Sequence, residues 1–546
     1  MPSVTLEHFI RAAADIGAHG DNDTLPFDVD NRFVSENTDA LAKLAFAYFQ
    51  ELESGSEQGA KTALNALQIF SERLLVPTGP AGFRITTKIH PFWTIYFNGI
   101  GVAIAEAHEP SRSPRVHSYR FATSGSDLFG PAGSWREFRE ACITDSATQG
   151  SDSMVVQTDI SSFYEHSSHH RIQDSLSDLF PGTHVAAQID RLLSRFASGR
   201  SFGLPVGGQC SRVLAELFLA SIDRILTDSN LVWRRFVDDF VLITANQAEA
   251  YRALAILSHA LADYGLSLNR TKTTVLTSKH FVDYVRTQID GPGDEADALR
   301  EIDLHFDPYS DTPEADYEQL KDTVDQLDVA RLLDLELRKG QPDRFTTIQI
   351  GRTLRLHSPK VAFQLCSTLL APQNLHAFRA SWSSIMRGIA AVCADSQFAA
   401  IYGRIDVLLD AIPNSSAHLL LPEASCLHYL KTIRFRWTQS RAQYVLATYS
   451  STTSQTVKRG CIECWRTWKD RTGFNRLRNR WNTLHSEEQR SLWLAAPDFD
   501  TEGDNFRAQV KHSIPETCRL GIERQSRPTF ASIYIDWSTN GDQSGQ

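Results

Sequence analysis

Three patterns of hydrophobic and polar positions follow one another along the chain. In residues 1–80, apolar side chains recur at three- and four-residue spacing, most clearly in 40–50 and 59–75, and this spacing predicts helices. In residues 81–290, short apolar runs alternate with helical spacing, which predicts strands and helices together. In residues 291–546, helical segments are separated by Pro or Gly. We therefore predict an α+β fold, with an antiparallel sheet and packed helices, followed by an all-α region of stacked helix pairs or helical repeats.

Two predicted strands in the middle region lie next to acidic residues. Residues 154–158 form a short, mainly apolar run that ends at Asp159, as a buried strand would. Further along the chain, the runs 231–237 and 240–244 are separated only by Asp238 and Asp239, which predicts a hairpin with a two-residue acidic turn. Two acidic residues suit such a turn poorly unless a cation neutralises them.

Carboxylates gathered at one edge of a sheet can hold two divalent cations, which activate a nucleophile and stabilise the leaving oxygen in phosphoryl transfer. Each residue also has an ordinary explanation. Asp159 can cap the helix that follows it, and the Asp238–Asp239 pair can be a solvent-exposed hairpin tip.

Two further segments follow the same logic. Residues 202–211 place several glycines, including Gly207, around Pro205, which predicts a stiff loop that allows close backbone approach. Residues 265–273 contain Lys272, which can lie near a triphosphate. A helix-capping loop and a solvated lysine explain the same residues.

The charge of the chain is uneven. The net charge of −10 counts mildly against nucleic-acid binding, but residues 458–480 are strongly basic. Trp and Phe alternate with the basic residues there, as in proteins that bind single-stranded nucleic acid, or as in a helical hairpin with buried Trp and a solvated basic face. The candidate nucleic-acid contacts are Arg466, Lys469, Arg476 and Arg478.

The cysteines and the hydropathy of the chain indicate where in the cell we expect the protein. Eight scattered cysteines do not make a disulfide framework, so we expect a reducing cytoplasm. Cys461 and Cys464, with His485 further on, are half of a zinc-binding pattern, but two core cysteines on a helix explain the pair better. No apolar run is long enough to span a membrane.

The order of these features resembles the palm of a reverse transcriptase. An Asp at a strand end, a Gly-Leu-Pro loop with its helix, an Asp-Asp hairpin, a second helix and Gly-Leu-x-Leu-Asn-x-x-Lys-Thr follow one another between residues 154 and 273. The resemblance covers residues 80–290 and implies a right-hand polymerase fold. It places the fingers before Asp159, then the palm, then thumb-like helices. The implied activity is RNA-directed DNA synthesis by addition of deoxynucleotides to a 3′-hydroxyl.

The resemblance also implies which residues act. Asp159, Asp238 and Asp239 would bind Mg²⁺ or Mn²⁺, with help from the Ile160 carbonyl. Tyr164 would lie under the sugar of the incoming nucleotide, where its ring would exclude a 2′-hydroxyl. The implied nucleotide contacts, taken together, are Tyr164, Phe163, Arg115, Arg120, Gly207 and Lys272.

The motifs are similar to those of one group within this family. Asp-Ile-Ser-Ser-Phe-Tyr-Glu, Gly-Leu-Pro-Val-Gly-Gly and the long helical C-terminal region look like bacterial antiphage and abortive-infection reverse transcriptases. The implied partners are an RNA template or a structured non-coding RNA, the DNA product, deoxynucleoside triphosphates and another copy of the protein. Two alternatives stay open. One is template-independent or protein-primed DNA synthesis by the same site, and the other is a non-catalytic RNA-binding or assembly protein on this scaffold.

Overall fold

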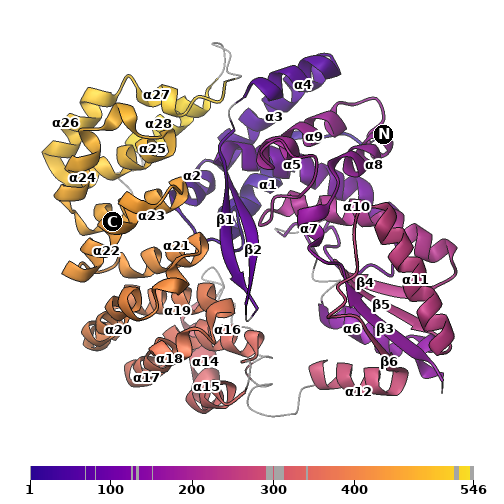
Figure 1. Cartoon of the computed structure of the whole chain (residues 1–546). Helices are drawn as coiled ribbons and strands as arrows, with labels where there is room; N and C mark the ends of the chain where they lie inside the picture. The colour runs from indigo at the N-terminus through magenta and orange to yellow at the C-terminus, as the bar shows by residue number, and fades with distance from the viewer. Residues whose placement is uncertain are drawn as a thin grey trace.

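The computed structural model is α+β in its first half and all-helical in its second, which confirms the predicted fold class. In Figure 1 a sheet lies at one side, the N-terminal helices lie in the centre and the C-terminal helices form the other side. The predicted boundary at residue 290 lies outside the described residues. The structure describes residues 2–67, 69–79, 81–123, 127–130, 135–150, 152–289, 299, 313–339, 342–521 and 528–540.

The N-terminal helices form one core around Phe9. Its ring contacts Phe46, Phe49 and Tyr96. The helix that carries Tyr96 is apolar along nearly its whole length and is buried on almost every side, as a central helix must be. The helices of this part are α1 (Leu6–His19), α2 (Val29–Glu36), α3 (Thr38–Ser54), α4 (Glu57–Ala66), α5 (Pro91–His108), α8 (His169–Leu179) and α9 (Val185–Phe196).

A two-stranded hairpin interrupts the predicted helical region. The helix expected over 59–75 ends at Ala66, and β1 (Ser71–Thr78) pairs antiparallel with β2 (Gly82–Ile89). β2 is rich in β-branched residues, which favour strands, whereas the residues of β1 alone do not specify a strand. β1 is therefore a strand because it pairs with β2. The turn contains Gly79 at a φ of +54°, which glycine adopts without strain.

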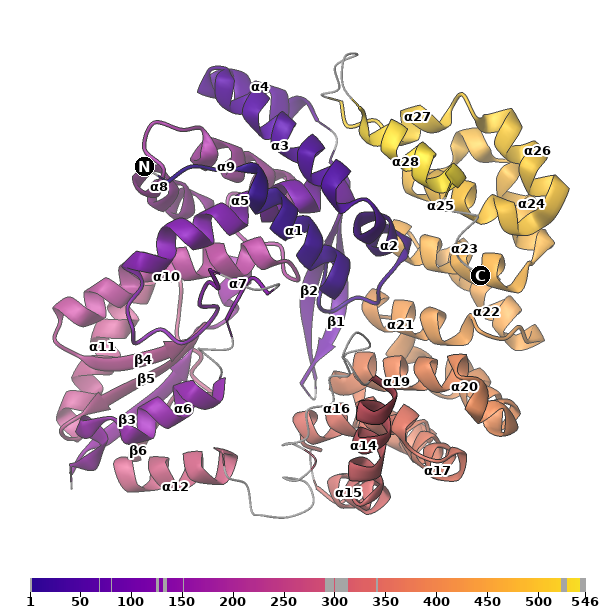
Figure 2. The same cartoon turned by 180° about the vertical axis from the view of Figure 1, so that it is seen from behind.

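The second sheet has four antiparallel strands in the order β4-β5-β3-β6. Both faces of the sheet are covered by helices (Figures 1 and 2). The strands are β3 (Met154–Asp159), β4 (Val232–Phe236), β5 (Asp239–Thr244) and β6 (Thr274–Thr277). The covering helices are α10 (Gln209–Asp228) and α11 (Gln247–Asp263) on one face, and α6 (Trp135–Thr144) and α12 (Ser278–Ile289) on the other.

Alternation along the strands explains why the apolar runs are continuous. Val156 and Leu242 belong to the large core beneath α10 and α11. Val155 and Val241 belong to a separate core with Phe138 of α6 and residues of α12. Successive residues of a strand point to opposite faces, so a strand buried on both faces needs apolar side chains at every position.

The C-terminal helices stack in two rows. In the inner row α16, α19, α21, α23 and α25 each pack on the next, and α17, α20 and α22 lie along the outer side (Figure 1). The crossing of α16 and α19 joins two glycines, because a Cβ on Gly388 would lie 1.9 Å from the carbonyl oxygen of Gly351. The helices are α14 (Pro313–Asp325), α15 (Val329–Leu337), α16 (Arg344–Thr353), α17 (Pro359–Leu369), α18 (Pro372–Leu375), α19 (Trp382–Ala394), α20 (Tyr402–Ser415), α21 (Glu423–Ile433), α22 (Gln439–Ser451), α23 (Gln455–Trp468), α24 (Arg471–Arg478), α25 (Ser486–Ala495), α26 (Asp500–Val510), α27 (Ile514–Thr517) and α28 (Phe530–Asn540).

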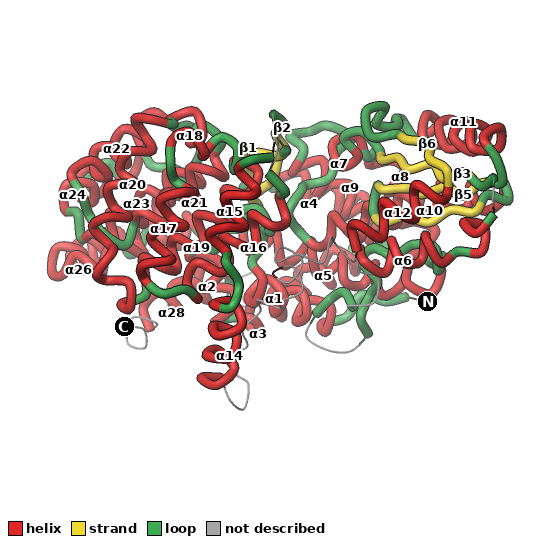
Figure 3. Tube along the Cα trace, turned by 90° about the horizontal axis from the view of Figure 1, so that it is seen from below, coloured by secondary structure: helices red, strands yellow, loops and turns green. Residues whose placement is uncertain are grey.

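The hairpin β1–β2 lies between the helical rows and the rest of the chain (Figure 3). The carboxylate of Glu72 in β1 accepts hydrogen bonds from the backbone N–H groups of Gln455 and Thr456, both at 2.9 Å. A carboxylate at a helix N-terminus satisfies donors that have no partner within the helix, so Glu72 caps α23. In return, Glu423 of α21 accepts a bond from the N–H of Leu75 at 2.9 Å.

The last described helix, α28, packs against α2. The ring of Phe33 in α2 lies 5.5 Å from that of Phe530, 5.1 Å from that of Tyr534 and 5.0 Å from that of Trp537. The Trp537 indole N–H donates to Glu36 at 2.6 Å. None of the described helices is both long and apolar enough to cross a lipid bilayer.

Candidate active site

The three acidic residues singled out in the sequence meet at one end of the four-stranded sheet. Asp159 is the last residue of β3 and Asp239 is the first residue of β5, and the two are direct cross-strand partners. Asp238 immediately precedes β5 in the turn from β4. The strands that present these residues are buried on both faces, so the carboxylates lie on a rigid support.

The hairpin turn differs from the predicted one by one residue. The two turn residues are Val237 and Asp238, and Asp239 already belongs to the strand. Val237 has a φ of +54°, a conformation that a β-branched side chain adopts only under strain. Its N–H donates to Ser118 Oγ at 2.9 Å, and its carbonyl accepts from Arg235 at 3.2 Å. The contact with Ser118, outside the hairpin, and the contact with Arg235 of β4 together set the turn that carries Asp238.

A buried ion-pair network stands behind this turn. The guanidinium of Arg235 donates two bonds of 2.7 Å to Asp223 and one of 2.8 Å to Glu216. Glu216 also accepts from Arg112 at 2.9 Å and from the hydroxyl of Ser118. None of these residues was among the predicted site residues. The sequence could have pointed to this network, because Glu216 and Asp223 are charged residues on the otherwise apolar face of α10.

The carboxylates of the acidic cluster repel one another. Burial and the neighbouring Asp239 carboxylate raise the pKa of Asp238 to about 6, and burial together with Asp159 raises the pKa of Asp239. Lys272 Nζ donates to Asp159 Oδ2, and this bond raises the pKa of Lys272 above its ordinary value. The backbone N–H of Asn269 donates to the Asp159 carbonyl at 2.8 Å, which holds the Lys272 loop beside β3.

The acidic cluster has the donor set for divalent cations. Asp159 Oδ1 is buried and has no hydrogen-bond partner, so it is available as a ligand. Two backbone hydrogen bonds flank Ile160: the N–H of Ser161 donates to the Ser267 carbonyl, and the N–H of Asn269 donates to the Asp159 carbonyl. Neither bond uses the Ile160 carbonyl as its acceptor. In the part of the chain that the structure describes, no three Asp, Glu, His or Cys side chains enclose a metal site by themselves. Mg²⁺ in phosphoryl-transfer sites is held by one or two carboxylates together with substrate phosphates and water, which this arrangement allows.

Tyr164 lies beside the carboxylates on the short helix α7 (Phe163–His166). It is half-buried, and burial together with the nearby Tyr119 raises its pKa well above the ordinary value, with a further contribution from Asp238. The carbonyl of Tyr164 accepts a bond from the N–H of Leu204 at 2.8 Å. The Gly-Leu-Pro loop therefore supports the helix that presents the Tyr164 ring.

Residues 116–289 match the family described as reverse transcriptase (RNA-dependent DNA polymerase). This segment is a reverse transcriptase domain. A domain of this family is a nucleotidyltransferase, and the matched residues contain the whole acidic cluster, Tyr164 and Lys272. No curated protein matches the sequence.

The chain is also similar to solved structures of telomerase. Apo telomerase from Candida tropicalis, truncated from its C-terminal domain, has 12% identity and a TM-score of 0.28, with 38% of this chain and 49% of that one covered. Telomerase from Candida albicans, with a fragment of telomeric RNA, has 13% identity and a TM-score of 0.31, with 63% and 65% covered. A second apo structure from Candida tropicalis has 12% identity and a TM-score of 0.30, with 68% and 72% covered. This chain thus spans about half of the first of these proteins, and such low similarity carries no information on substrates.

Two residues predicted to contact the nucleotide, Phe163 and Gly207, instead pack within the protein. Phe163 is only 2% exposed and packs against Phe218, so its ring supports Tyr164 and is not available to a nucleotide. Gly207 has a φ of +119°, and a Cβ there would lie 2.2 Å from the side chain of Asn22. The close backbone approach expected of this loop is therefore to Asn22, within the protein.

The two arginines predicted in the fingers have structural partners. Arg115 donates to the carbonyl of Leu231 at 2.9 Å, at the end of β4 opposite to the acidic turn. Arg120 pairs with Glu109 at 2.6 Å and donates to the carbonyl of Ser113 at 3.1 Å. Both guanidiniums thus have partners within the protein, and the contacts predicted for them with a nucleotide stay predictions.

The basic segment of α23 and α24 also differs from the predicted stacking surface. Trp465, Phe474 and Trp481 are at most 6% exposed, so these rings form the core between helices. Arg466 pairs with Glu463 at 2.7 Å and Arg478 pairs with Glu502 at 2.8 Å, which neutralises both. Lys469 and Arg476 remain exposed. These three rings are therefore not available to stack on bases, and the contacts predicted for Lys469 and Arg476 with nucleic acid stay predictions.

The two cysteines of α23 are buried among helices. Cys461 and Cys464 are buried free thiols, and burial raises the pKa of both. The predicted third partner, His485, lies against the Phe70 ring instead. These cysteines belong to the helical core.

Proposed function

We propose that this protein is an RNA-directed DNA polymerase that adds deoxynucleotides to a 3′-hydroxyl. The cross-strand pairing of Asp159 with Asp239, with Asp238 in the adjoining turn, carries the proposal. This register places three carboxylates at the end of a rigid sheet within a domain of the reverse transcriptase family.

The side chains have distinct parts in the proposed reaction. Asp159, Asp238 and the Ile160 carbonyl would hold Mg²⁺ or Mn²⁺, with Asp239 completing the acidic cluster. A divalent cation there supplies charge stabilisation to the reacting oxygens. Tyr164 limits the space beside the sugar and selects deoxynucleotides. Lys272 keeps its proton because of its bond to Asp159 and donates it to the departing pyrophosphate.

Incorporation of labelled deoxythymidine triphosphate on an oligo(dT)-primed poly(rA) template tests the proposal. The wild type should incorporate label with Mg²⁺ or Mn²⁺, and Asp238→Asn should abolish incorporation while the circular dichroism spectrum stays unchanged. Asp263→Asn, at an exposed position on α11, is the matched control and should keep wild-type activity. Undiminished incorporation by Asp238→Asn would refute the proposal. With all four deoxynucleoside triphosphates supplied, a product whose sequence is unrelated to the template would show template-independent synthesis by the same site.

We further propose that the protein acts in bacterial defence against phage, in the cytoplasm. The motif Asp-Ile-Ser-Ser-Phe-Tyr-Glu and the helical C-terminal region support this role, and eight free cysteines suit a reducing compartment. The proposed partners are an RNA template or structured RNA, deoxynucleoside triphosphates and the DNA product, with a second copy of the chain as a further partner. Plaque counts on cells that express the wild type or Asp238→Asn test the role, and equal counts would contradict it.

A further inference from the structure

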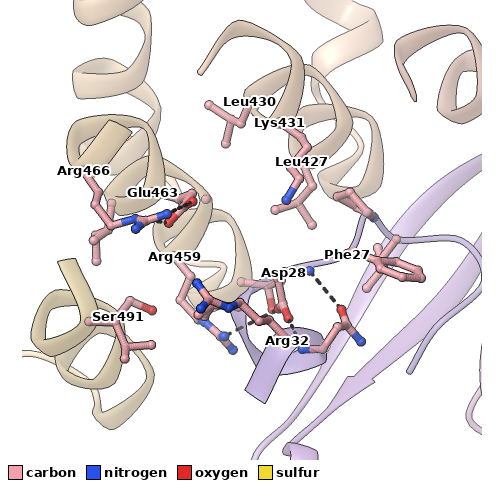
Figure 4. Close-up of a pocket in the computed structure, with 18 of the residues that line it drawn as sticks. Phe27, Asp28, Arg32, Leu427, Leu430, Lys431, Arg459, Glu463, Arg466 and Ser491 are labelled. Atoms are coloured by element: carbon pink, nitrogen blue, oxygen red, sulfur yellow. Dashed lines mark hydrogen bonds and ion pairs between the residues drawn. The ribbon is translucent and has the colours of Figure 1, made fainter. Parts of the chain in front are cut away.

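A cavity of about 490 Å³ lies where the N-terminal helices meet the C-terminal ones. Its walls come from the segment before α2 and from α2 itself, and from α21, α23, α25 and α28 (Figure 4). It shares no lining residue with the acidic cluster of the reverse transcriptase domain. Cavities of 300–1,000 Å³ are typical of small-molecule sites, so this one is large enough for a ligand.

One wall of the cavity carries more positive than negative charge. Arg434 donates to Glu463 at 3.0 Å, and Arg466 donates two bonds of 2.7 and 2.8 Å to the same carboxylate. Lys431 lies on α21 one turn before Arg434 and extends into the cavity (Figure 4). Arg466 also donates to Asp498 at 3.2 Å. Among the described residues, Lys431 makes no ion pair or hydrogen bond.

Two other basic groups of the lining are neutralised by carboxylates. Arg459 pairs with Asp30 at 2.7 Å and with Glu487 at 3.0 Å. Lys88 pairs with Asp21 at 2.6 Å and with Asp28 at 3.0 Å. Unlike these two groups, Lys431 has no carboxylate paired with it among the described residues.

The surroundings of Lys431 disfavour its charge. Burial and the Arg434 guanidinium on the same helix lower its pKa to about 8, and Arg466 on α23 acts in the same direction. Glu463 on α23 and Asp28 before α2 oppose this shift without removing it. A half-buried ammonium with no paired anion is costly, so an anion bound beside it would be stabilised.

The rest of the lining is apolar and aromatic. Leu427 and Leu430 of α21 face the cavity, and Trp537 of α28 also lines it. Phe27 lies on the side of Lys431 away from Arg466, and 45% of its surface is exposed (Figure 4). An exposed ring next to a cationic wall suits a ligand that has both an anionic group and a flat or apolar part.

We propose that this cavity binds a nucleotide-sized, phosphate-bearing small molecule, with the phosphate on Lys431 and the base toward Phe27. An ammonium without a paired anion can donate charge-assisted hydrogen bonds to the oxygens of a phosphate. The site joins residues 25–36 to residues 427–538, so the ligand stabilises the contact between the two parts of the chain. The site is independent of the polymerase chemistry.

Titration calorimetry with adenosine monophosphate tests the proposal. EDTA is present, so that the acidic cluster holds no divalent cation and does not bind the phosphate. The wild type should bind adenosine monophosphate, should bind inorganic phosphate more weakly, and should not bind adenosine. Lys431→Met should weaken the binding of adenosine monophosphate at least about tenfold. The matched control Lys360→Met, at an exposed lysine of α17, should bind as the wild type does.

Thermal unfolding of the same proteins gives a second readout. Lys431→Met removes an unpaired buried charge, so the free variant should melt at or above the wild-type temperature and should lose the upward shift that adenosine monophosphate produces. Wild-type affinity should also fall between pH 7 and 9.5 as Lys431 loses its proton, because the phosphate stays dianionic throughout this range. The proposal is overturned if the wild type binds none of the probes, if adenosine binds as well as its monophosphate, if Lys431→Met binds normally, or if affinity is independent of pH.

Discussion

The guanidinium of Arg235 donates a hydrogen bond to the main-chain carbonyl of Val237 at 3.2 Å. Val237 is held at a positive φ, which costs roughly 1–3 kcal/mol for a non-glycine residue. Arg235 is itself fixed by Asp223 and Glu216 of α10. The position of Asp238 is therefore set by a buried network that reaches the turn from the neighbouring helix.

Replacing Arg235 should damage the fold as well as the activity. Arg235→Met leaves Asp223 and Glu216 buried without their shared cation, so the free energy of unfolding should fall by about 3–5 kcal/mol. Urea denaturation measures this change. Arg252→Met, on the exposed face of α11, should change stability by less than about 0.5 kcal/mol. A loss of similar size in both variants would contradict the role of the network.

Ser118 offers a milder test of the same turn. Ser118→Ala removes the acceptor for the Val237 N–H and the donor to Glu216 without changing charge. We expect stability to fall by about 1–3 kcal/mol and kcat for nucleotide incorporation to fall more than the affinity for the nucleotide. Steady-state kinetics under conditions where the variant is fully folded measure the split. If KM alone changes, Ser118 does not position the acidic turn.

The ring of Tyr164 should control the choice of sugar. Tyr164→Ala opens space beside the incoming nucleotide, so the ratio of ribonucleotide to deoxynucleotide incorporation should rise by about tenfold or more. Tyr164→Phe keeps the ring and should discriminate as the wild type does. Incorporation of single nucleotides of each kind on the same primer gives the ratio. Equal ratios for Tyr164→Ala and Tyr164→Phe would exclude the ring as the selecting group.

Lys272 should matter for the reaction and little for the fold. Its side chain is 65% exposed, so loss of its pair with Asp159 should change stability by less than about 1 kcal/mol. Because Lys272 acts as a proton donor, Lys272→Met should lower kcat about a hundredfold. Lys272→Arg keeps the charge but gives up a proton less readily, so it separates the two roles. Wild-type kcat in Lys272→Met would rule out both.

The contact between His428 and Thr24 should make stability depend on pH. His428 Nε2 lies 3.1 Å from the Thr24 carbonyl, and burial lowers the pKa of His428 to about 3. In the unfolded chain His428 takes up a proton near pH 6.5, so its contribution is complete above that pH and is lost as the pH falls toward 3. Between pH 6.5 and 4.5 the wild type should lose about 2 kcal/mol more than His428→Gln in urea titrations. His170→Gln, at an exposed position, should behave like the wild type.

Local pattern was sufficient for much of the fold. The mainly apolar runs of β3 and β5 could be predicted as strands, and their antiparallel pairing places Asp159 opposite Asp239. The β1 strand could not be predicted, because it depends on pairing with β2. The same limit applies to the turn at Val237, whose shape is imposed by Ser118 and Arg235.

The basic residues show why site residues are harder to predict than strands. Arg120 and Arg466 suit phosphate binding by type and spacing. In the fold each meets a carboxylate, Glu109 or Glu463, that other elements bring to it. Whether an arginine is free depends on these tertiary partners, and sequence spacing does not reveal them. Lys431 is the reverse case, since nothing in its local sequence distinguishes it and its surroundings leave it unpaired.

The enclosure of Phe33 by Phe530, Tyr534 and Trp537 has a consequence for synthesis of the protein. Glu36 and Trp537, which bond across this contact, are 501 positions apart. The ribosome synthesises α28 about 500 residues after α2, so α2 stays without these aromatic neighbours during that interval. Nascent chains should therefore expose Phe33 to chaperones and proteases until α28 has left the ribosome.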